Sequence, residues 1–154
     1  MTLVVFLVLV FIAASSGAVF KPGTWYEGLR KPAWTTPGWV FPLVWTILYV
    51  LIATAGWLVW EANSHGIALY FWAAQWVFNT AWSWLFFGLK RMDWGFADIC
   101  FLWLSACGFI LAAWNLVPLA SWLFLPYLVW ISIAGVLNLT VWRLNPEWQA
   151  SQRA

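Results

Sequence analysis

The stretch IALYFWAAQWVFNTAWSWLFFGL, residues 67–89, decides the fold class of this chain. It contains no charged side chain, and Lys90 and Arg91 follow it directly. A helix of about 20 apolar residues is long enough to cross the hydrocarbon core of a bilayer. We therefore predict that residues 67–89 form a membrane-spanning helix.

Four further apolar stretches flank this one, and the composition of the whole chain is typical of a membrane protein. The 154 residues are 65% hydrophobic and 8% charged, whereas soluble domains are about 25% charged. We expect a single domain, residues 1–154, with the fold of an all-α membrane protein. The predicted five-transmembrane-helix bundle has its spans at residues 3–20, 39–60, 67–89, 94–115 and 122–144.

The two segments at the start of the chain need separate interpretation. Residues 3–20 also fit a signal peptide by length and by the small residues at 14–17, but no Lys or Arg precedes them, which favours a retained span. Residues 21–38 contain three prolines, three glycines and four charges. Such residues stop helices, so we expect a structured loop between helices 1 and 2, lying over one end of the bundle.

The basic residues are distributed asymmetrically along the predicted spans. With five crossings, every Lys and Arg lies on the side of the C-terminus, and the opposite side carries Glu61 and His65. The positive-inside rule then places the C-terminus and the 21–38 loop in the cytoplasm and the N-terminus on the opposite side. Helical spans favour a bacterial inner membrane. The basic residues are Lys21, Arg30, Lys31, Lys90, Arg91, Arg143 and Arg153.

The 17 tryptophans are several times more than a chain of this length usually contains. About half lie near predicted span ends, where indole rings prefer the headgroup level of a membrane. The others lie deeper, and two interpretations stay open for them: packing within the bundle, or stacking against a planar aromatic ligand. The deeper set consists of Trp45, Trp72, Trp76, Trp82, Trp103 and Trp130.

Polar residues form stripes on the predicted helices. Gln75, Asn79 and Trp82 share one face of the third span because they are four and three residues apart. Amides at membrane depth face the bundle interior, where they either hydrogen-bond a neighbouring helix or contact a ligand. Trp45 and Tyr49 pair in the same way on the second span. A stripe on the fifth span contains Tyr127, Trp130, Ala134, Leu137, Asn138 and Val141.

Several classes of chemistry lack the residues they need. No set of His, Cys and carboxylates has metal-ligand spacing, and no catalytic triad or nucleotide loop is present. Seven scattered basic residues do not make a nucleic-acid surface. Asp98 is the one acid inside a predicted span; an ion pair with Lys90, Arg91 or Arg143 is the favoured role, and a functional site is the alternative.

Motifs of aromatic, proline and amide residues run through residues 20–145. They are Trp25-Tyr26, Leu29, Lys31-Pro32-x-Trp34, Pro37-x-Trp39-Val40-Phe41-Pro42, Trp45, Leu48-Tyr49, Gln75, Asn79, Trp82, Phe86-Phe87-Gly88, Pro126-Tyr127, Trp130, Ala134, Leu137-Asn138, Trp142-Arg143 and Asn145. Together they resemble the TspO/translocator protein family, also called tryptophan-rich sensory proteins or peripheral benzodiazepine receptors.

The resemblance implies a five-helix bundle, often a homodimer, with a cavity beneath the first loop. Family members bind porphyrins such as protoporphyrin IX and synthetic isoquinoline or benzodiazepine ligands. Six residues match family pocket positions: Trp45, Asn79, Trp82, Trp130, Ala134 and Leu137. Adding the polar and aromatic stripes gives the full candidate ligand-binding set of Trp34, Trp39, Trp45, Tyr49, Asn79, Trp82, Tyr127, Trp130, Ala134, Leu137 and Asn138.

Three functional hypotheses follow. The leading one is a receptor or transporter-like membrane protein that binds a porphyrin in tetrapyrrole or stress regulation, with Arg30 and Lys31 near the ligand's propionates and no cofactor. The second is light-dependent oxidative degradation of the bound porphyrin, which the resemblance associates with Trp45 and Trp130. The third is a scaffold for a partner protein. Sterol binding is not expected, because residues 137–143 lack the Tyr of the cholesterol-recognition pattern.

Overall fold

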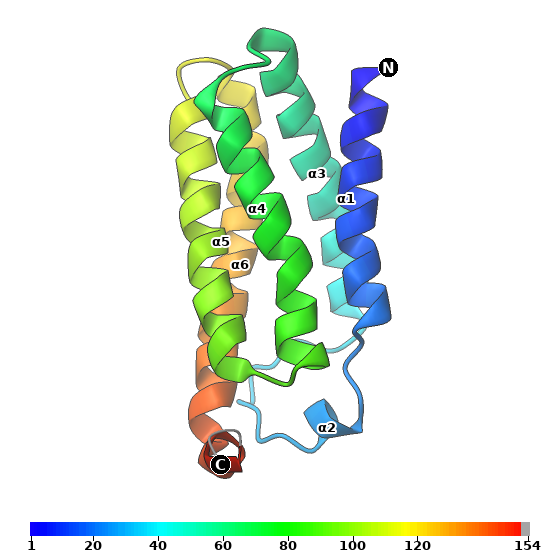
Figure 1. Ribbon diagram of the computed structural model, residues 1–154, viewed down its shortest axis with the longest axis vertical. Coiled ribbons are helices and arrows are strands. Elements are labelled where there is room, and N and C mark those ends of the chain that lie inside the picture. Colours follow the sequence, from blue (N-terminus) through cyan, green and yellow to red (C-terminus); the bar gives the residue numbers. More distant parts are fainter. Residues whose placement is uncertain (152–154) are drawn as a thin grey trace.

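Long helices run side by side along the longest axis of the molecule, and the two termini lie at opposite ends (Figure 1). The computed structural model describes residues 1–151, and this part of the chain contains helices and no strand. The long elements are α1 (Thr2–Val19), α3 (Val40–Ala62), α4 (Ile67–Ser83) with the π-helix η1 (Trp84–Gly88), α5 (Met92–Ala113) and α6 (Pro118–Leu144). Two short helices, α2 (Thr24–Glu27) and α7 (Pro146–Ser151), flank them.

Four of the described helices, α1, α3, α5 and α6, are long and apolar enough to cross a membrane. The predicted third span is divided: α4 has 17 residues, and the helix continues from it as the π-helical turn η1. The all-helical fold and the apolar character of four spans are thus confirmed. A fifth crossing by α4 and η1 belongs to the proposal below.

The helices close into a ring in the order α1, α3, α6, α5, α4, and α4 packs back against α1. Chain order therefore differs from spatial order, because α6 lies between α3 and α5. This arrangement turns the polar stripes of α4 and α6 toward the interior. Gln75 and Asn79 of α4 and Asn138 of α6 are all buried.

Three predicted boundaries are corrected by the structure. The last long helix begins at Pro118 rather than at residue 122, because a proline at the first helical position gives up no hydrogen bond. Pro126, which we expected either in the first turn or at a kink, consequently lies inside α6. Helix α5 begins at Met92, so Met92 and Asp93 form its first turn instead of ending the previous span.

Small residues on the helices allow close contact between helices of the same chain. A Cβ atom at Gly108 of α5 would lie 2.5 Å from the ring of Phe71 of α4, so the two helices approach closely here. Ala13 of α1 is buried, and Gly17, one turn later, faces Ser83 of α4. These small residues therefore allow close packing of helices within the chain.

The basic residues gather at one end of the bundle, where the C-terminus lies (Figure 1). Lys21 follows α1, Lys90 and Arg91 separate η1 from α5, and Arg143 lies in the last turn of α6. The remaining two described basic residues belong to residues 20–39, which we call the lid loop because they cross this end of the bundle. Arg153 lies outside the described residues.

Candidate functional site

A chain of hydrogen bonds crosses the middle of the bundle. The Tyr49 hydroxyl donates to Oδ1 of Asn79 at 3.0 Å, and Nδ2 of Asn79 donates to the Tyr127 hydroxyl at 2.9 Å. The Tyr127 hydroxyl in turn donates to Oε1 of Gln75 at 3.1 Å. Three helices, α3, α4 and α6, are joined by this network, and Tyr127 at its centre is fully buried. The interhelical alternative predicted for Asn79 is therefore realised.

Aromatic rings surround this polar network. The Trp45 indole lies against Tyr49 with ring centroids 5.2 Å apart, and it meets the Tyr127 ring edge-on at 6.2 Å. The Trp45 ring is only partly buried. The rings are tilted by 30° for Trp45 with Tyr49 and by 63° for Trp45 with Tyr127, so they pack as an aromatic cluster around the polar network.

A second polar contact lies nearer the charged end. Nε1 of Trp82 donates to Oδ1 of Asn138 at 3.3 Å, and Nδ2 of Asn138 donates to the backbone carbonyl of Met92 at 2.8 Å. The Trp82 indole also stacks on Phe86, with centroids 5.0 Å apart and an interplanar angle of 17°. Asn138 is thus satisfied by two other helices, again as the interhelical alternative predicts.

The lid loop packs directly onto these residues. Trp25 and Tyr26 of α2 both meet the Phe86 ring edge-on, with centroids 5.9 and 6.1 Å away. Together with Leu137 and Val141 they form an apolar cluster that covers the charged end of the bundle. Burial in this cluster raises the pKa of the Tyr26 phenol. The predicted structured loop is therefore present, and it touches Trp82 through Phe86.

Trp130 has a different environment from the other deep indoles. Its ring meets Phe41, which follows the lid loop, at 5.6 Å and an angle of 72°. Its Nε1 is buried and has no hydrogen-bond partner among the described residues. Buried N–H groups are nearly always paired with protein or water, and Nε1 of Trp25 in α2 is likewise buried without a partner among the described residues.

Comparison with known proteins gives the family of this fold. A sequence model of the TspO/MBR family matches residues 2–143, which extend from α1 to the end of α6. The chain belongs to the TspO/MBR family. It is 45% identical to the tryptophan-rich sensory protein of Cereibacter sphaeroides over 132 residues, covering 86% of this chain and 84% of the relative.

Other members of the family have comparable sequence identity to this chain. Protein CrtK of Rhodobacter capsulatus is 41% identical over 138 residues, covering 87% of this chain and 86% of that protein. The human translocator protein is 34% identical over 134 residues, covering 84% of this chain and 79% of the relative. The predicted resemblance is confirmed, and the chain is a membrane protein of the TspO/MBR family.

The remaining deep tryptophans of this TspO/MBR protein fasten helices together. Nε1 of Trp72 donates to the backbone carbonyl of Ile52 at 2.9 Å, and Nε1 of Trp76 donates to that of Leu9 at 2.7 Å. Trp103 lies on the outer face of α5, is exposed, and donates to Ser132 at 2.9 Å. Packing is thus the role of these three indoles, whereas Trp45, Trp82 and Trp130 surround the candidate site.

Asp98 departs from its predicted role. We expected an ion pair with a basic residue at the charged end, but Asp98 forms none among the described residues, and its Oδ2 is buried without a partner. Asp98 is buried inside the bundle, whereas Arg91 precedes α5 and donates from Nε at 2.8 Å to the carboxylate of Asp93 in the first turn. Asp98, on the interior face, is left unpaired.

The basic residues of the lid loop are engaged within the protein. Nζ of Lys31 donates to three backbone carbonyls of the loop, at 2.6 Å for Tyr26 and 3.1 Å for Glu27 and Leu29. An ammonium group has three N–H donors, so Lys31 has none left for a propionate. The Arg30 guanidinium forms an exposed ion pair with Glu147 at 3.1 Å.

The structure brings together most of the predicted site residues. Trp45, Tyr49, Asn79 and Tyr127 form one group around the polar network, and Ala134 packs against the same core. The other predicted residues lie as follows: Trp82, Leu137 and Asn138 join the cluster beneath the lid loop, Trp130 lies beside Phe41, and Trp34 and Trp39 are exposed and outside both clusters.

Four of the surrounding residues lie outside the predicted ligand-binding set. Gln75 ends the polar network, and Trp25, Tyr26 and Phe86 form the contact between the lid loop and Trp82. Their signal was present, because all four belong to the motifs that carry the family resemblance. Helical spacing alone does not predict that these residues touch, because they come from segments that are distant in sequence.

Proposed function

We propose that this TspO/MBR protein is a receptor or transporter-like protein that binds a porphyrin, such as protoporphyrin IX, or a related planar aromatic ligand inside the bundle. The ligand lies between the indoles of Trp45 and Trp130, beneath the lid loop. The names of the relatives, a sensory protein and a translocator protein, support a role in recognition and not in conventional catalysis.

The observation that carries this proposal is the unpaired, buried Nε1 of Trp130. Leaving a buried donor unsatisfied costs about 1–3 kcal/mol, and the neighbouring deep indoles of Trp72 and Trp76 avoid this cost by donating to backbone carbonyls. A ligand acceptor, such as a carboxylate or a ring nitrogen, satisfies the donor. The aromatic side chain of Phe41 beside it gives such a ligand a flat apolar surface.

The experiment is a titration of the purified protein in detergent with protoporphyrin IX, followed by quenching of tryptophan fluorescence. We expect Trp130→Ala to weaken binding by about tenfold or more, because it removes both the ring and the donor. Trp130→Phe keeps a ring and removes the donor, so it separates the two contributions. Trp103→Ala, on the outer face of α5, is the matched control and leaves the affinity within about twofold. Unchanged affinity of Trp130→Ala excludes Trp130 from the site.

The membrane arrangement is part of the same proposal. We propose that α4 continues through η1 as a fifth crossing, which agrees with termini at opposite ends of the bundle (Figure 1). The basic end and the lid loop then face the cytoplasm of a bacterium by the positive-inside rule, with the protein in the inner membrane. Packing of α1 against α3 and α4 supports a retained first span.

Photo-oxidative degradation of the porphyrin stays a second candidate, favoured by the close spacing of oxidisable rings. Trp45 lies 5.2 Å from Tyr49 and 6.2 Å from Tyr127 between ring centroids. Illumination of the protein with protoporphyrin IX in air tests this second candidate. Bilin-like absorbance above that of porphyrin alone supports catalysis, and the absence of such absorbance excludes catalysis. The homodimer and the scaffold role also stay predictions.

A further inference from the structure

A buried carboxyl group on the interior face of α5 has no assigned role. The side chain of Asp98 is 7% exposed, and its Oδ2 has no hydrogen-bond partner among the described residues. The ion pairs of the described chain, Arg30 with Glu147 and Arg91 with Asp93, both lie elsewhere. A carboxyl group inside an apolar bundle is costly unless a donor or a cation faces it.

Close contacts of the neighbouring helices fix the level of Asp98 in the bundle. A Cβ atom at Gly95 would lie 3.1 Å from Oδ1 of Asn138 on α6 and 3.1 Å from the ring of Phe86 on η1. One turn later, Ile99 is the nearest neighbour of Gly135 on α6.

Helix α5 runs antiparallel to both neighbours, as Figure 1 shows, so positions on the three helices can be matched from these contacts. Counting along α6 places Asp98 level with Gly135, and counting back along η1 and α4 places it level with Ser83. The residues that precede these two, Ala134 and Trp82, are predicted ligand-binding residues. Asp98 therefore lies at the depth of the candidate site, on a helix that contributes no residue to the predicted ligand-binding set.

We infer that Asp98 is a ligand-contacting residue of this site and accepts a hydrogen bond from an N–H donor of the ligand. The inference rests on the proposed function and narrows it to planar heterocycles that carry an N–H group. Trp130 and Asp98 then make complementary contacts, since the unpaired indole N–H meets an acceptor of the ligand and the unpaired carboxyl oxygen meets a donor. A ligand of the same shape without an N–H leaves the Asp98 oxygen unpaired.

Carbazole and fluorene test this directly, because they are flat tricyclic molecules of nearly the same shape and differ by an N–H in place of a CH₂. Equilibrium dialysis against protein-free micelles of the same detergent measures the binding of each and cancels its partition into detergent. We expect the unaltered protein to bind carbazole about tenfold more tightly than fluorene, as one hydrogen bond from the carbazole N–H to the carboxyl oxygen of Asp98 allows.

Two substitutions at Asp98 separate recognition from packing. Asp98→Leu removes the acceptor and abolishes the preference for carbazole, while fluorene binding is kept or improved. Asp98→Asn has nearly the same shape and retains a neutral acceptor, so about a threefold preference remains. Asp93→Asn, on the same helix but outside the site, is the control and keeps the full preference. Circular dichroism and size-exclusion chromatography confirm that each variant is folded.

The outcomes are distinct for the two claims. Equal affinity of the unaltered protein for carbazole and fluorene overturns the inference. A preference for carbazole that survives in Asp98→Leu also overturns it, and so does a preference that is lost in Asp93→Asn as well as in Asp98→Leu. A parallel titration with protoporphyrin IX tests the proposed function by itself. If the porphyrin binds and the preference is absent, only the role of Asp98 fails; if the porphyrin does not bind, the proposed function fails.

Discussion

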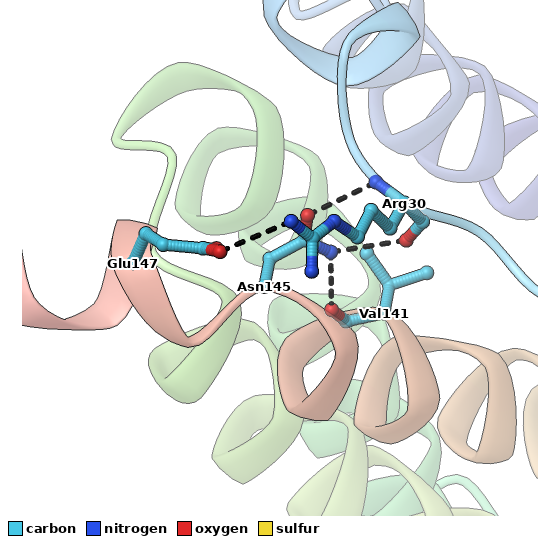
Figure 2. Close-up of polar contacts among 4 residues, drawn as sticks. All are labelled: Arg30, Val141, Asn145 and Glu147. Atoms are coloured by element: carbon cyan, nitrogen blue, oxygen red, sulfur yellow. Dashed lines mark hydrogen bonds and ion pairs between the residues drawn. The ribbon is translucent and has the colours of Figure 1, made fainter.

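The side-chain amide of Asn145 holds the backbone of Arg30 from both sides (Figure 2). The Arg30 N–H donates to Oδ1 of Asn145 at 3.0 Å, and Nδ2 of Asn145 donates to the Arg30 carbonyl at 3.0 Å. The same Nδ2 donates to the Val141 carbonyl at 2.7 Å, which anchors the amide to the last turn of α6. One buried side chain thus ties the lid loop to the end of the bundle.

Replacing Asn145 by Ala releases the lid loop. The substitution removes two hydrogen bonds across 115 positions of sequence, each worth about 0.5–1.5 kcal/mol. We expect backbone amides of residues 24–31 to exchange about tenfold faster with deuterium, and bound porphyrin to dissociate faster. Hydrogen exchange by mass spectrometry measures the first effect, and stopped-flow fluorescence measures the second.

The matched control for this experiment is Arg30→Ala. It removes the ion pair with Glu147, which is exposed on both sides and therefore worth about 0–1 kcal/mol, but it keeps the backbone groups that Asn145 binds. Lid exchange in Arg30→Ala should stay close to that of the unaltered protein. Equal acceleration in both variants argues that the ion pair, and not the amide, holds the loop.

Tyr127→Phe tests the polar network at the centre of the bundle. The hydroxyl receives a hydrogen bond from Asn79 and donates one to Gln75, so its removal leaves both buried amides short of a partner. We expect a loss of about 1–2 kcal/mol in unfolding free energy, at the upper end of values for membrane interiors. Thermal unfolding in detergent measures it. Tyr70→Phe, at an exposed position, should lower the unfolding free energy by less than about 0.5 kcal/mol. If Tyr70→Phe and Tyr127→Phe lower it equally, the polar network makes no special contribution to stability.

Gly56→Ala tests the close approach of α4 to α3. A Cβ atom at Gly56 would lie 2.5 Å from Nε1 of Trp72, which donates to the carbonyl of Ile52. The indole must move and weaken this bond, so we expect a loss of about 1–3 kcal/mol. Gly135→Ala is the control within a helix, because its Cβ would meet its nearest neighbour at 3.6 Å. It should be neutral or gain up to about 1 kcal/mol from helix propensity. Similar stability of the two variants contradicts the packing argument.

Cysteine labelling tests the orientation. In a background with Cys100 and Cys107 replaced by Ala, His65→Cys marks the poorly charged end and Glu27→Cys marks the lid loop. If the basic end is cytoplasmic, an impermeant maleimide labels His65→Cys in spheroplasts, and it labels Glu27→Cys only after the membrane is permeabilised. The reverse pattern shows the opposite orientation, and labelling of both from outside contradicts five crossings.

Properties that depend on neighbouring residues in sequence were predicted well. The helical class, the approximate ends of the long helices, the structured lid loop and the inward faces of Gln75, Asn79 and Asn138 all follow from hydropathy and helical spacing. The predicted start of α6 was wrong because Leu116 to Ser121 carry no charge. Their composition therefore does not distinguish the turn from the apolar helix that follows it.

The sequence by itself determined that the chain is an apolar helical bundle with its basic residues at one end, because bilayer thickness and the cost of buried charge act on each segment separately. Only the tertiary structure decided which polar groups are satisfied. Helices distant in sequence meet in the bundle, and their contacts pair Asn79 with Tyr127 and Asn138 with the Met92 carbonyl. The same packing buries Nε1 of Trp25, Nε1 of Trp130 and Oδ2 of Asp98 without a partner among the described residues.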